Sequence, residues 1–206
     1  MTEHSTITVR DIQANAKPLA DMIANFGSLS FMQARLICGD EMKTNRVVNY
    51  LKRNRIAKKT EDGKHVVGFF NPKPDEELEN CLWVAFRSAA FKDEEGKTQV
   101  DLDTLRYAIR PNNRVNVMYI QNNKCHNVVY LTSDNIASVI MAIRTANSGQ
   151  PKEVFEDLDY SFVIDDLKVA DDLAKMDFPY SYRLIYIQQT EKGVPKITTI
   201  KKPAIA

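Results

Sequence analysis

Nitrogen donors gather on one side of a basic stretch in the first part of the chain. Placed at intervals of about 100°, as in an α-helix, the residues from Lys43 to Arg53 divide into two sides. The mostly apolar side consists of Thr44, Val47, Val48 and Leu51. The polar side is an arc of about 120° that holds Asn45, Arg46, Asn49, Lys52 and Arg53. Arg and Lys hydrogen-bond guanine edges, Asn hydrogen-bonds adenine, and the cations also bind phosphate. The alternative interpretation is an ordinary solvated helix face.

A second group of cations follows on a predicted β-hairpin. Residues 56–60 and 65–70 have the composition of strands and flank Glu61-Asp62-Gly63-Lys64, a turn built on Asp-Gly. Lys58, Lys59 and Lys64 would bring this hairpin to a phosphate backbone, which adds affinity without sequence choice. His65 is interpreted as a hairpin side chain with no special role, in preference to a pH sensor. With Lys43 at the helix start, these lysines complete the candidate binding residues.

Local signals predict the helices that position the donors. Leu19, Met22, Ile23 and Phe26 recur at helical spacing, and Gly27 ends that amphipathic helix. Because each such helix must bury its apolar side, we expect it to pack against the basic helix and the short helix between them.

Capping residues separate the next two helices. Ser30 and Gln33 match the capping box, Gly39 is a natural helix end, and Asp40 is a natural N-cap for the basic helix. Asn54 is expected to adopt the left-handed conformation that ends the basic helix. The order short helix, tight connection, basic helix and hairpin is that of a winged helix-turn-helix.

The stretches FGSLSFMQARLICG and RVVNYLKRNRIAKK resemble the winged helix of replication-relaxation-like proteins from bacterial plasmids and other mobile elements. In that family, phrases of the type G-x-L-T-x-x-Q and L-x-x-L-x-x-x-G-L-V lead into the second helix and the wing. Gly27, Leu29 and Gln33 match the first phrase, with Ser30 for the usual Thr. Leu51 and Ile56 fit the second, whereas Asn54-Arg55 stands where Gly is common. The resemblance covers about the first third of the chain and implies binding to DNA.

Charge is distributed unevenly along the 206 residues. Residues 31–65 contain nine Lys or Arg and four Asp or Glu, a net charge of +5, so the remainder carries −4 within the total of +1. Such asymmetry is typical of a nucleic-acid-binding module joined to another part.

Cysteine usage and hydropathy argue against several classes of protein. Cys38, Cys81 and Cys125 are widely spaced and odd in number, which disfavours a disulfide framework, and no metal-ligand spacing accompanies them. The chain lacks a secretory signal and an 18-residue apolar segment. We therefore expect a cytoplasmic protein without membrane attachment, metal or small-molecule cofactor.

Two prolines in Asn71-Pro72-Lys73-Pro74 predict a linker, which gives domains at 1–71 and 75–206. The second domain should begin with a helix whose buried stripe is Leu78, Leu82, Ala85, Phe86 and Ala89. A charged surface loop is expected at 92–97. The further expected elements are strands at 115–120, 125–131, 160–164, 182–188 and 197–200, and helices from Ser133 or Asp134 and at 167–176. Strand 182–188 is apolar on both faces, as expected of a central strand rather than an edge strand. The predicted fold class is α+β, a winged helix-turn-helix followed by a compact α/β domain.

Restriction-endonuclease-like domains follow the winged helix in the family that the chain resembles, so a degenerate domain of that type is one interpretation of residues 75–206. That chemistry needs an Asp and a D/E-x-K on neighbouring strands to hold Mg²⁺ and to activate water. Only the triplet Asp166-Leu167-Lys168 follows a strand, and it is more typical of a first helical turn. Strands 115–120 and 125–131 contain no Asp or Glu, and Arg110-Pro111-Asn112-Asn113 offers amides where a carboxylate is needed. We therefore expect no catalytic residues.

The sequence thus predicts a DNA-binding protein, a regulator or a replication or mobilisation accessory of a mobile element. Its expected partners are duplex DNA and, through residues 75–206, a second copy of the chain. Two alternatives stay open: a protein–protein interaction module on a winged-helix scaffold, and a diverged metal-dependent nuclease.

Overall fold

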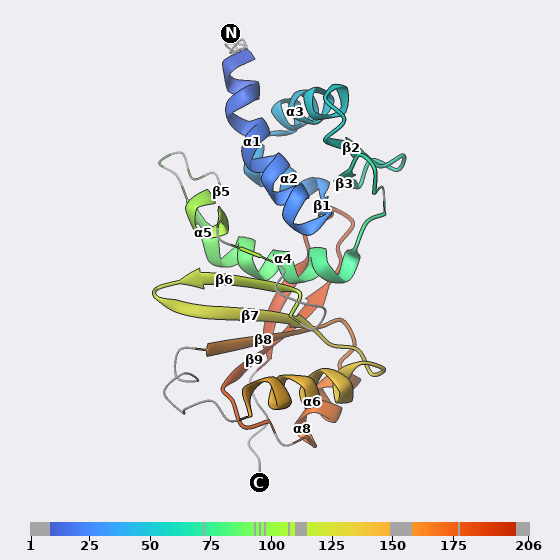
Figure 1. Cartoon of the computed structure of the whole chain (residues 1–206), viewed down its shortest axis with the longest axis vertical. Helices are drawn as coiled ribbons and strands as arrows, with labels where there is room; N and C mark the ends of the chain where they lie inside the picture. The colour runs from blue at the N-terminus through green and yellow to red at the C-terminus, as the bar shows by residue number, and fades with distance from the viewer. Residues whose placement is uncertain are drawn as a thin grey trace. The chain divides into compact units, whose positions relative to one another are not determined.

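A computed structural model of the chain (Figure 1) describes residues 9–200 except 72, 93, 95, 97, 107, 110–114, 149–157 and 177. The fold is mixed α+β, with three separate sheets among the described residues. The Cα atoms group into two compact units: residues 1–79 with 86–106, and residues 80–85 with 107–206. Among the residues described, none forms a helix with the length and apolar character needed to cross a bilayer.

Unit 1 contains most of the helices. Its elements are α1 (Val9–Phe26), β1 (Ser28–Ser30), α2 (Phe31–Cys38), α3 (Glu41–Arg53), β2 (Ala57–Lys59), β3 (His65–Gly68), the ends of α4 (Glu76–Ala89), β4 (Ala90–Lys92), β5 (Thr98–Val100) and α5 (Leu102–Arg106). Helix α4 is shared, because its middle residues 80–85 group with unit 2.

Helices α1, α2 and α3 form the core of unit 1. The predicted stripe of α1 is confirmed, since Leu19, Met22, Ile23 and Phe26 are at most 5% exposed. Gly27 ends the helix with φ 83°, a left-handed conformation that costs glycine little, and its N–H donates to the carbonyl of Ile23. These side chains pack against the buried sides of α2 and α3, which fixes the orientation of α3 within the unit.

The predicted caps of α2 and α3 are confirmed. Ser30 and Gln33 form a reciprocal capping box at the start of α2, and Gly39 ends that helix with φ 95°. Asp40 caps α3 by accepting a hydrogen bond from the Lys43 N–H at 2.8 Å. Helix α3 begins at Glu41, slightly earlier than the predicted core at Lys43.

The end of α3 differs from the prediction. Asn54 has φ −88°, and the left-handed residue is Arg55 at φ 55°. The amide of Asn54 instead donates to the Tyr50 carbonyl at 2.8 Å, which holds Asn54 on the last turn of the helix. The reversal of the chain therefore falls on the next residue, a cation rather than the Gly common in the resembling family.

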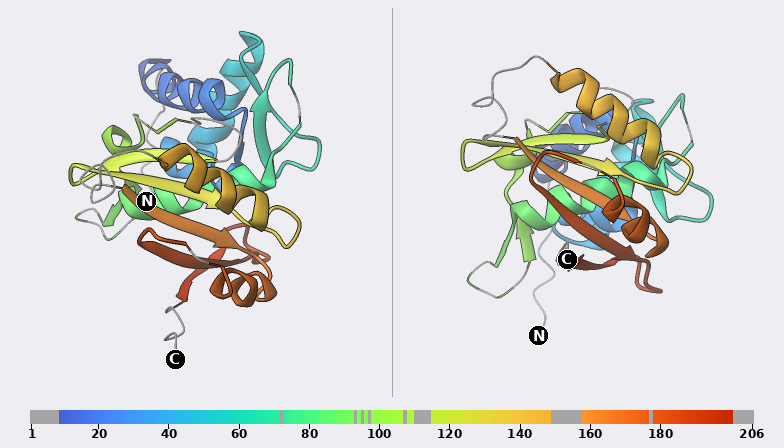
Figure 2. Two further views of the ribbon diagram at one scale, coloured as in Figure 1. Left: turned by 60° about the horizontal axis from the view of Figure 1, so that its bottom comes forward. Right: turned by 90° about the horizontal axis from the view of Figure 1, so that it is seen from below.

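Strands β2 and β3 form the predicted hairpin, with a turn at Gly63. Strand β1, which was not predicted, pairs with β3 and makes a sheet of order β1-β3-β2. Its Ser28–Ser30 segment is too short for a periodicity signal, and its pairing partner lies far along the chain. In Figure 2 the hairpin, drawn in teal, extends from the end of α3.

Helix α4 buries the predicted stripe, with Leu78, Leu82 and Ala85 at 0% exposure. Asp75 caps it by accepting from the Leu78 N–H at 3.0 Å. The expected surface loop at 92–97 falls partly outside the described residues, and it joins two short strands, β4 and β5, that were not predicted. Arg110 to Asn113 lie outside the described residues altogether.

Unit 2 is built on one five-stranded sheet. Its elements are β6 (Val117–Gln121), β7 (Lys124–Tyr130), α6 (Ile136–Asn147), β8 (Leu158–Ile164), α8 (Lys168–Ala174), β9 (Tyr182–Gln188) and β10 (Lys196–Ile200). The strand order is β10-β9-β8-β7-β6, with β7, β8 and β9 parallel and the two edges antiparallel. Side chains of α6 and α8 form one core with residues of β7, β8 and β9.

Strand β9 is a central strand, as predicted, because it pairs with β10 and β8 and buries the consecutive residues Leu184 and Ile185. One prediction for unit 2 needs correction. Neither Ser133 nor Asp134 caps α6, since the N-cap residue is Asn135. The Asn135 amide oxygen is used elsewhere, as the acceptor for the Thr132 N–H at 2.9 Å.

Candidate nucleic-acid interface

The predicted division of α3 into two sides is present in the structure. Thr44, Val47, Val48 and Leu51 are at most 3% exposed. On the other side the exposed residues are Arg46, Asn49, Lys52 and Arg53, while Lys43 and Asn45 are half-buried. The candidate donors thus lie on the solvent side of the helix, because its apolar side is buried against α1 and α2.

Charge is graded along α3. At its start, Lys43 lies 3.9 Å from the Asp40 carboxylate, and Arg35 of α2 lies 3.7 Å from Glu41. These exposed pairs partly compensate the cations at that end. At the other end, Lys52 and Arg53 occupy the last turn, where the helix dipole favours positive charge. The uncompensated positive charge is therefore concentrated toward the end of α3, next to the hairpin.

Two of the hairpin lysines contact aromatic rings. The Lys59 ammonium lies 3.6 Å from the ring centroid of Phe31 and donates to the Asn45 amide oxygen at 3.4 Å. The Lys58 ammonium lies 5.4 Å from the ring centroid of Phe69. Cation–π contacts of this kind favour one position of a lysine that would otherwise be mobile. Lys59 thereby joins the hairpin to the first residue of α2 and to α3, a contact that the sequence analysis missed.

Lys64 lies exposed at the hairpin turn. Its backbone N–H donates to the Asp62 carboxylate at 3.0 Å, and its carbonyl accepts from the Phe31 N–H at 2.7 Å. The hydrogen bond from the Thr60 hydroxyl, followed by the one from the Lys64 backbone, lowers the pKa of Asp62. The turn is thus held by its own side chains while the Lys64 ammonium extends into solvent.

His65 is part of a buried polar network, and the preference for a hairpin side chain over a pH sensor stays a prediction. Its Nδ1 lies 2.9 Å from the Glu79 carboxylate, and the two side chains are 13% and 5% exposed. Glu79 also accepts from the Ser28 hydroxyl at 2.8 Å, and its carbonyl accepts from the Gln33 side chain at 2.8 Å. One residue of α4 therefore joins β1, α2 and β3.

Burial dominates the electrostatics of Glu79. Desolvation raises its pKa, while the Ser28 hydroxyl and His65 act in the opposite direction. The Ser28 hydroxyl in turn accepts from the Asp75 N–H at 3.0 Å, at the start of α4. The network holds the hairpin through the buried side of β3, and its members are not among the exposed donors of α3.

Unit 2 carries a separate polar cluster that the sequence analysis did not find. The Asp159 carboxylate of β8 accepts from Arg183 of β9 at 2.8 Å and lies 3.1 Å from Nδ1 of His126 on β7. His126 stacks on Tyr119 of β6 with ring centroids 4.9 Å apart. The register of the sheet aligns Tyr119, His126 and Asp159 across β6, β7 and β8, whereas Arg183 lies opposite Ser161 and reaches Asp159 diagonally. No group of three or more potential metal ligands occurs in the described part of the chain.

The triplet Asp166-Leu167-Lys168 starts a helix, as expected. The Asp166 carboxylate accepts from the Lys168 N–H at 2.9 Å, immediately before α8. The carboxylate is thus engaged in a local turn.

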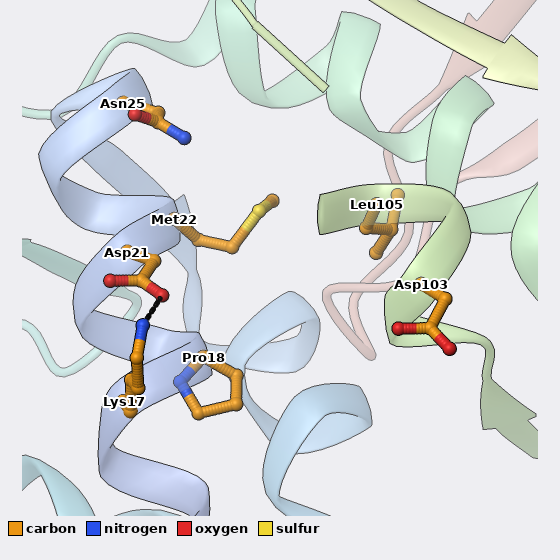
Figure 3. A pocket seen from close by; sticks show the side chains of 7 residues that line it. All are labelled: Lys17, Pro18, Asp21, Met22, Asn25, Asp103 and Leu105. Atoms are coloured by element: carbon orange, nitrogen blue, oxygen red, sulfur yellow. Dashed lines mark hydrogen bonds and ion pairs between the residues drawn. The ribbon is translucent and has the colours of Figure 1, made fainter. Parts of the chain in front are cut away.

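A hollow of about 240 Å³ lies between α1 and α5 in unit 1 (Figure 3). Its walls carry Lys17, Asp21, Asp103, Pro18, Met22, Asn25 and Leu105. Lys17 and Asp21 pair with each other at 2.7 Å across one helical turn. The hollow contains few groups that converge on one point, so we assign it no ligand.

Comparison of the chain with protein-family models, with curated proteins and with solved structures finds no match.

Proposed function

We propose that the chain binds duplex DNA through α3 and the hairpin β2–β3, in the manner of a winged helix-turn-helix. In this proposal α2 and α3 are the helix-turn-helix, α3 lies in the major groove, and the hairpin is the wing on the phosphate backbone. The observation that carries it is the exposed cationic end of α3 followed directly by a hairpin with three lysines. The resemblance to replication-relaxation-like proteins suggests a regulator or a replication or mobilisation accessory of a mobile element.

The candidate residues take different roles in this proposal. Arg46 and Asn49, one helical turn apart and both exposed, are the base-reading residues. Lys52, Arg53 and Lys64 contact phosphates. The remaining members, Lys43, Asn45, Lys58 and Lys59, are engaged by neighbouring residues and hold the interface in position.

Unit 2 takes no catalytic part in this proposal. We assign it to pairing two copies of the chain, since a dimer raises the specificity of a small DNA-binding module. The Asp166 carboxylate, whose hydrogen bond closes a turn, is not placed in a metal site. Unit 2 is then a degenerate nuclease-like frame or an unrelated α/β domain.

Fluorescence anisotropy with labelled duplex DNA across a salt series tests the interface. The logarithm of affinity should fall linearly with the logarithm of salt concentration, at a slope of about −0.9 per phosphate neutralised. Replacing Arg46 and Lys52 together by Ala should weaken binding by at least about tenfold and make the slope shallower. The stoichiometry of the same titration reports whether two copies bind one duplex.

A charge-matched control separates the interface from net charge. Lys192→Ala with Lys196→Ala removes two exposed cations from unit 2 and should leave affinity nearly unchanged. Equal affinity of the Arg46/Lys52 variant and the unaltered chain would overturn the assignment of α3. The alternative of a protein-binding winged helix would then be the better hypothesis.

A further inference from the structure

Phe70 is an exposed aromatic side chain at the base of the hairpin. It is 82% exposed, more than any other large apolar residue in the described part of the chain. Leaving so much aromatic surface in water forgoes the free energy of burial. Ile56, on the facing strand, is also 43% exposed.

The position of Phe70 is fixed by its neighbours. The Phe69 N–H donates to the Ile56 carbonyl at 3.0 Å, which extends the β2–β3 pairing beyond Ala57 and Gly68. The rings of Phe69 and Phe70 meet nearly at right angles, with centroids 5.2 Å apart and an interplanar angle of 76°. The Phe70 ring is therefore anchored from one direction, and its exposure leaves a ring face accessible.

The surroundings of this ring are cationic. Arg55, which is exposed like Phe70, immediately precedes Ile56, the residue whose carbonyl accepts from the Phe69 N–H. Residues 52–60 contain five Lys or Arg and no Asp or Glu. Lys58 lies over the neighbouring Phe69 ring. A ligand that fits here combines negative charge with a flat apolar face.

We propose that Phe70, with Arg55 and Lys58, is a stacking platform for an unpaired base of single-stranded DNA. Base–aromatic stacking beside cations that hold the backbone is the usual chemistry of single-strand binding. A blunt duplex offers the ring only its two terminal base pairs, because its other bases are already stacked on both sides. This proposal extends the proposed function, because it names the substrate as a duplex that carries a single-stranded segment. Only the binding of the duplex part rests on the proposed function.

The platform adjoins the cationic end of α3. The Arg55 N–H donates to the Lys52 carbonyl at 3.1 Å, and the Ile56 N–H donates to the Leu51 carbonyl at 2.9 Å. The base of the hairpin is thus fastened to the last turn of the helix. A strand that separates from a duplex at this end of α3 meets Phe70 beside the helix.

Anisotropy with three probes tests the platform: a blunt duplex, the same duplex with a tail of about ten thymidines, and the thymidine tail alone. The unaltered protein should bind the tailed duplex more tightly than the blunt one. Phe70→Ala should reduce affinity for the tailed duplex and for the tail by at least about fivefold and leave blunt-duplex affinity unchanged. Phe91→Ala, which removes a half-exposed ring from β4, should affect none of the three.

Phe70→Trp provides an independent measurement. The indole should retain tail affinity, and its fluorescence should be quenched when the thymidine tail binds. Trp83 is only 6% exposed, so the unaltered protein supplies the background. An unquenched Trp at position 70 in a sample saturated with tail would overturn the platform.

The outcomes distinguish the two proposals. The platform would be overturned if the protein bound the blunt and the tailed duplex with equal affinity. It would also be overturned if Phe70→Ala weakened binding to both duplexes equally. In either case the proposed function would still hold. Binding of the tail that depends on Phe70, without binding of the blunt duplex, would support the platform and contradict the proposed function. Loss of self-association in Phe70→Ala without any tail effect would identify a copy–copy contact and overturn the platform.

Discussion

At the scale of residues, the contact between His65 and Glu79 is the most buried pairing of a histidine with a carboxylate in the described part of unit 1. Glu79 is 5% exposed in its side chain and lies at the start of α4, and His65 begins the second strand of the hairpin. A carboxylate taken out of water is costly unless it is hydrogen-bonded and paired. The Ser28 hydroxyl and the imidazole provide that compensation. The position of the hairpin thus depends on a buried carboxylate of α4.

We predict that His65→Ala lowers the free energy of unfolding by about 3 kcal/mol, because it leaves the Glu79 carboxylate buried without its partner. Urea unfolding followed by circular dichroism measures the change. Lys64→Ala, which alters the exposed neighbour, should stay within about 0.5 kcal/mol of the unaltered protein. A small effect of His65→Ala, similar to that of Lys64→Ala, would show that the pair contributes nothing to stability.

At the scale of elements, the connection from α3 to the hairpin carries backbone strain. Arg55 adopts φ 55°, a left-handed conformation that costs a residue with a Cβ roughly 1–2 kcal/mol. Its N–H and that of Ile56 both donate to the last turn of α3, so the conformation is imposed by the helix end and the hairpin together.

We predict that Arg55→Gly raises the free energy of unfolding by about 0.5–1 kcal/mol, since glycine adopts this conformation without steric cost. The midpoint of thermal unfolding should rise accordingly. Asn54→Gly is the matched control: at φ −88° no strain is relieved, and its hydrogen bond to Tyr50 is lost, so stability should fall. A decrease in stability for Arg55→Gly would contradict the assignment of strain to this residue.

The elements also show where local sequence rules work. The caps at Ser30, Gly39 and Asp40 were predicted because each involves atoms within a few residues of one another. The N-cap of α6 was predicted at the wrong residue because Thr132 and Asn135 form two reciprocal hydrogen bonds just before the helix begins. Capping preferences of single residues do not predict this pair.

At the scale of the whole molecule, the compact units and the predicted linker do not divide the chain at the same place. Unit 1 includes Glu79 and residues 86–106, whereas the sequence-based boundary follows residue 71. The partners of Ser28, Gln33 and His65 therefore lie beyond that boundary, on α4. The boundaries 1–71 and 75–206 stay predictions.

We predict that a fragment of residues 1–71 is less stable than a fragment of residues 1–106. The shorter one leaves the polar groups of Ser28 and His65 without Glu79, and it removes the apolar side of α4. Its thermal midpoint should be lower by at least about 10 °C, or its transition should lose cooperativity. Equal midpoints would show that α4 is dispensable for unit 1 and would favour the boundary at residue 71.

The sequence by itself determined the order and type of α1, α2, α3 and the hairpin, together with the two sides of α3. Helical periodicity, capping pairs and turn residues involve only a few neighbouring positions, so they can be recognised in the local sequence. Tertiary structure decided the rest. Ser28 and Glu79 are 51 residues apart and His65 and Glu79 are 14 apart, and no local rule pairs them. The same holds for Lys59 over Phe31 and for β1 beside β3. Each depends on which elements the folded core brings together, because burial and pairing are settled by neighbours in space rather than in sequence.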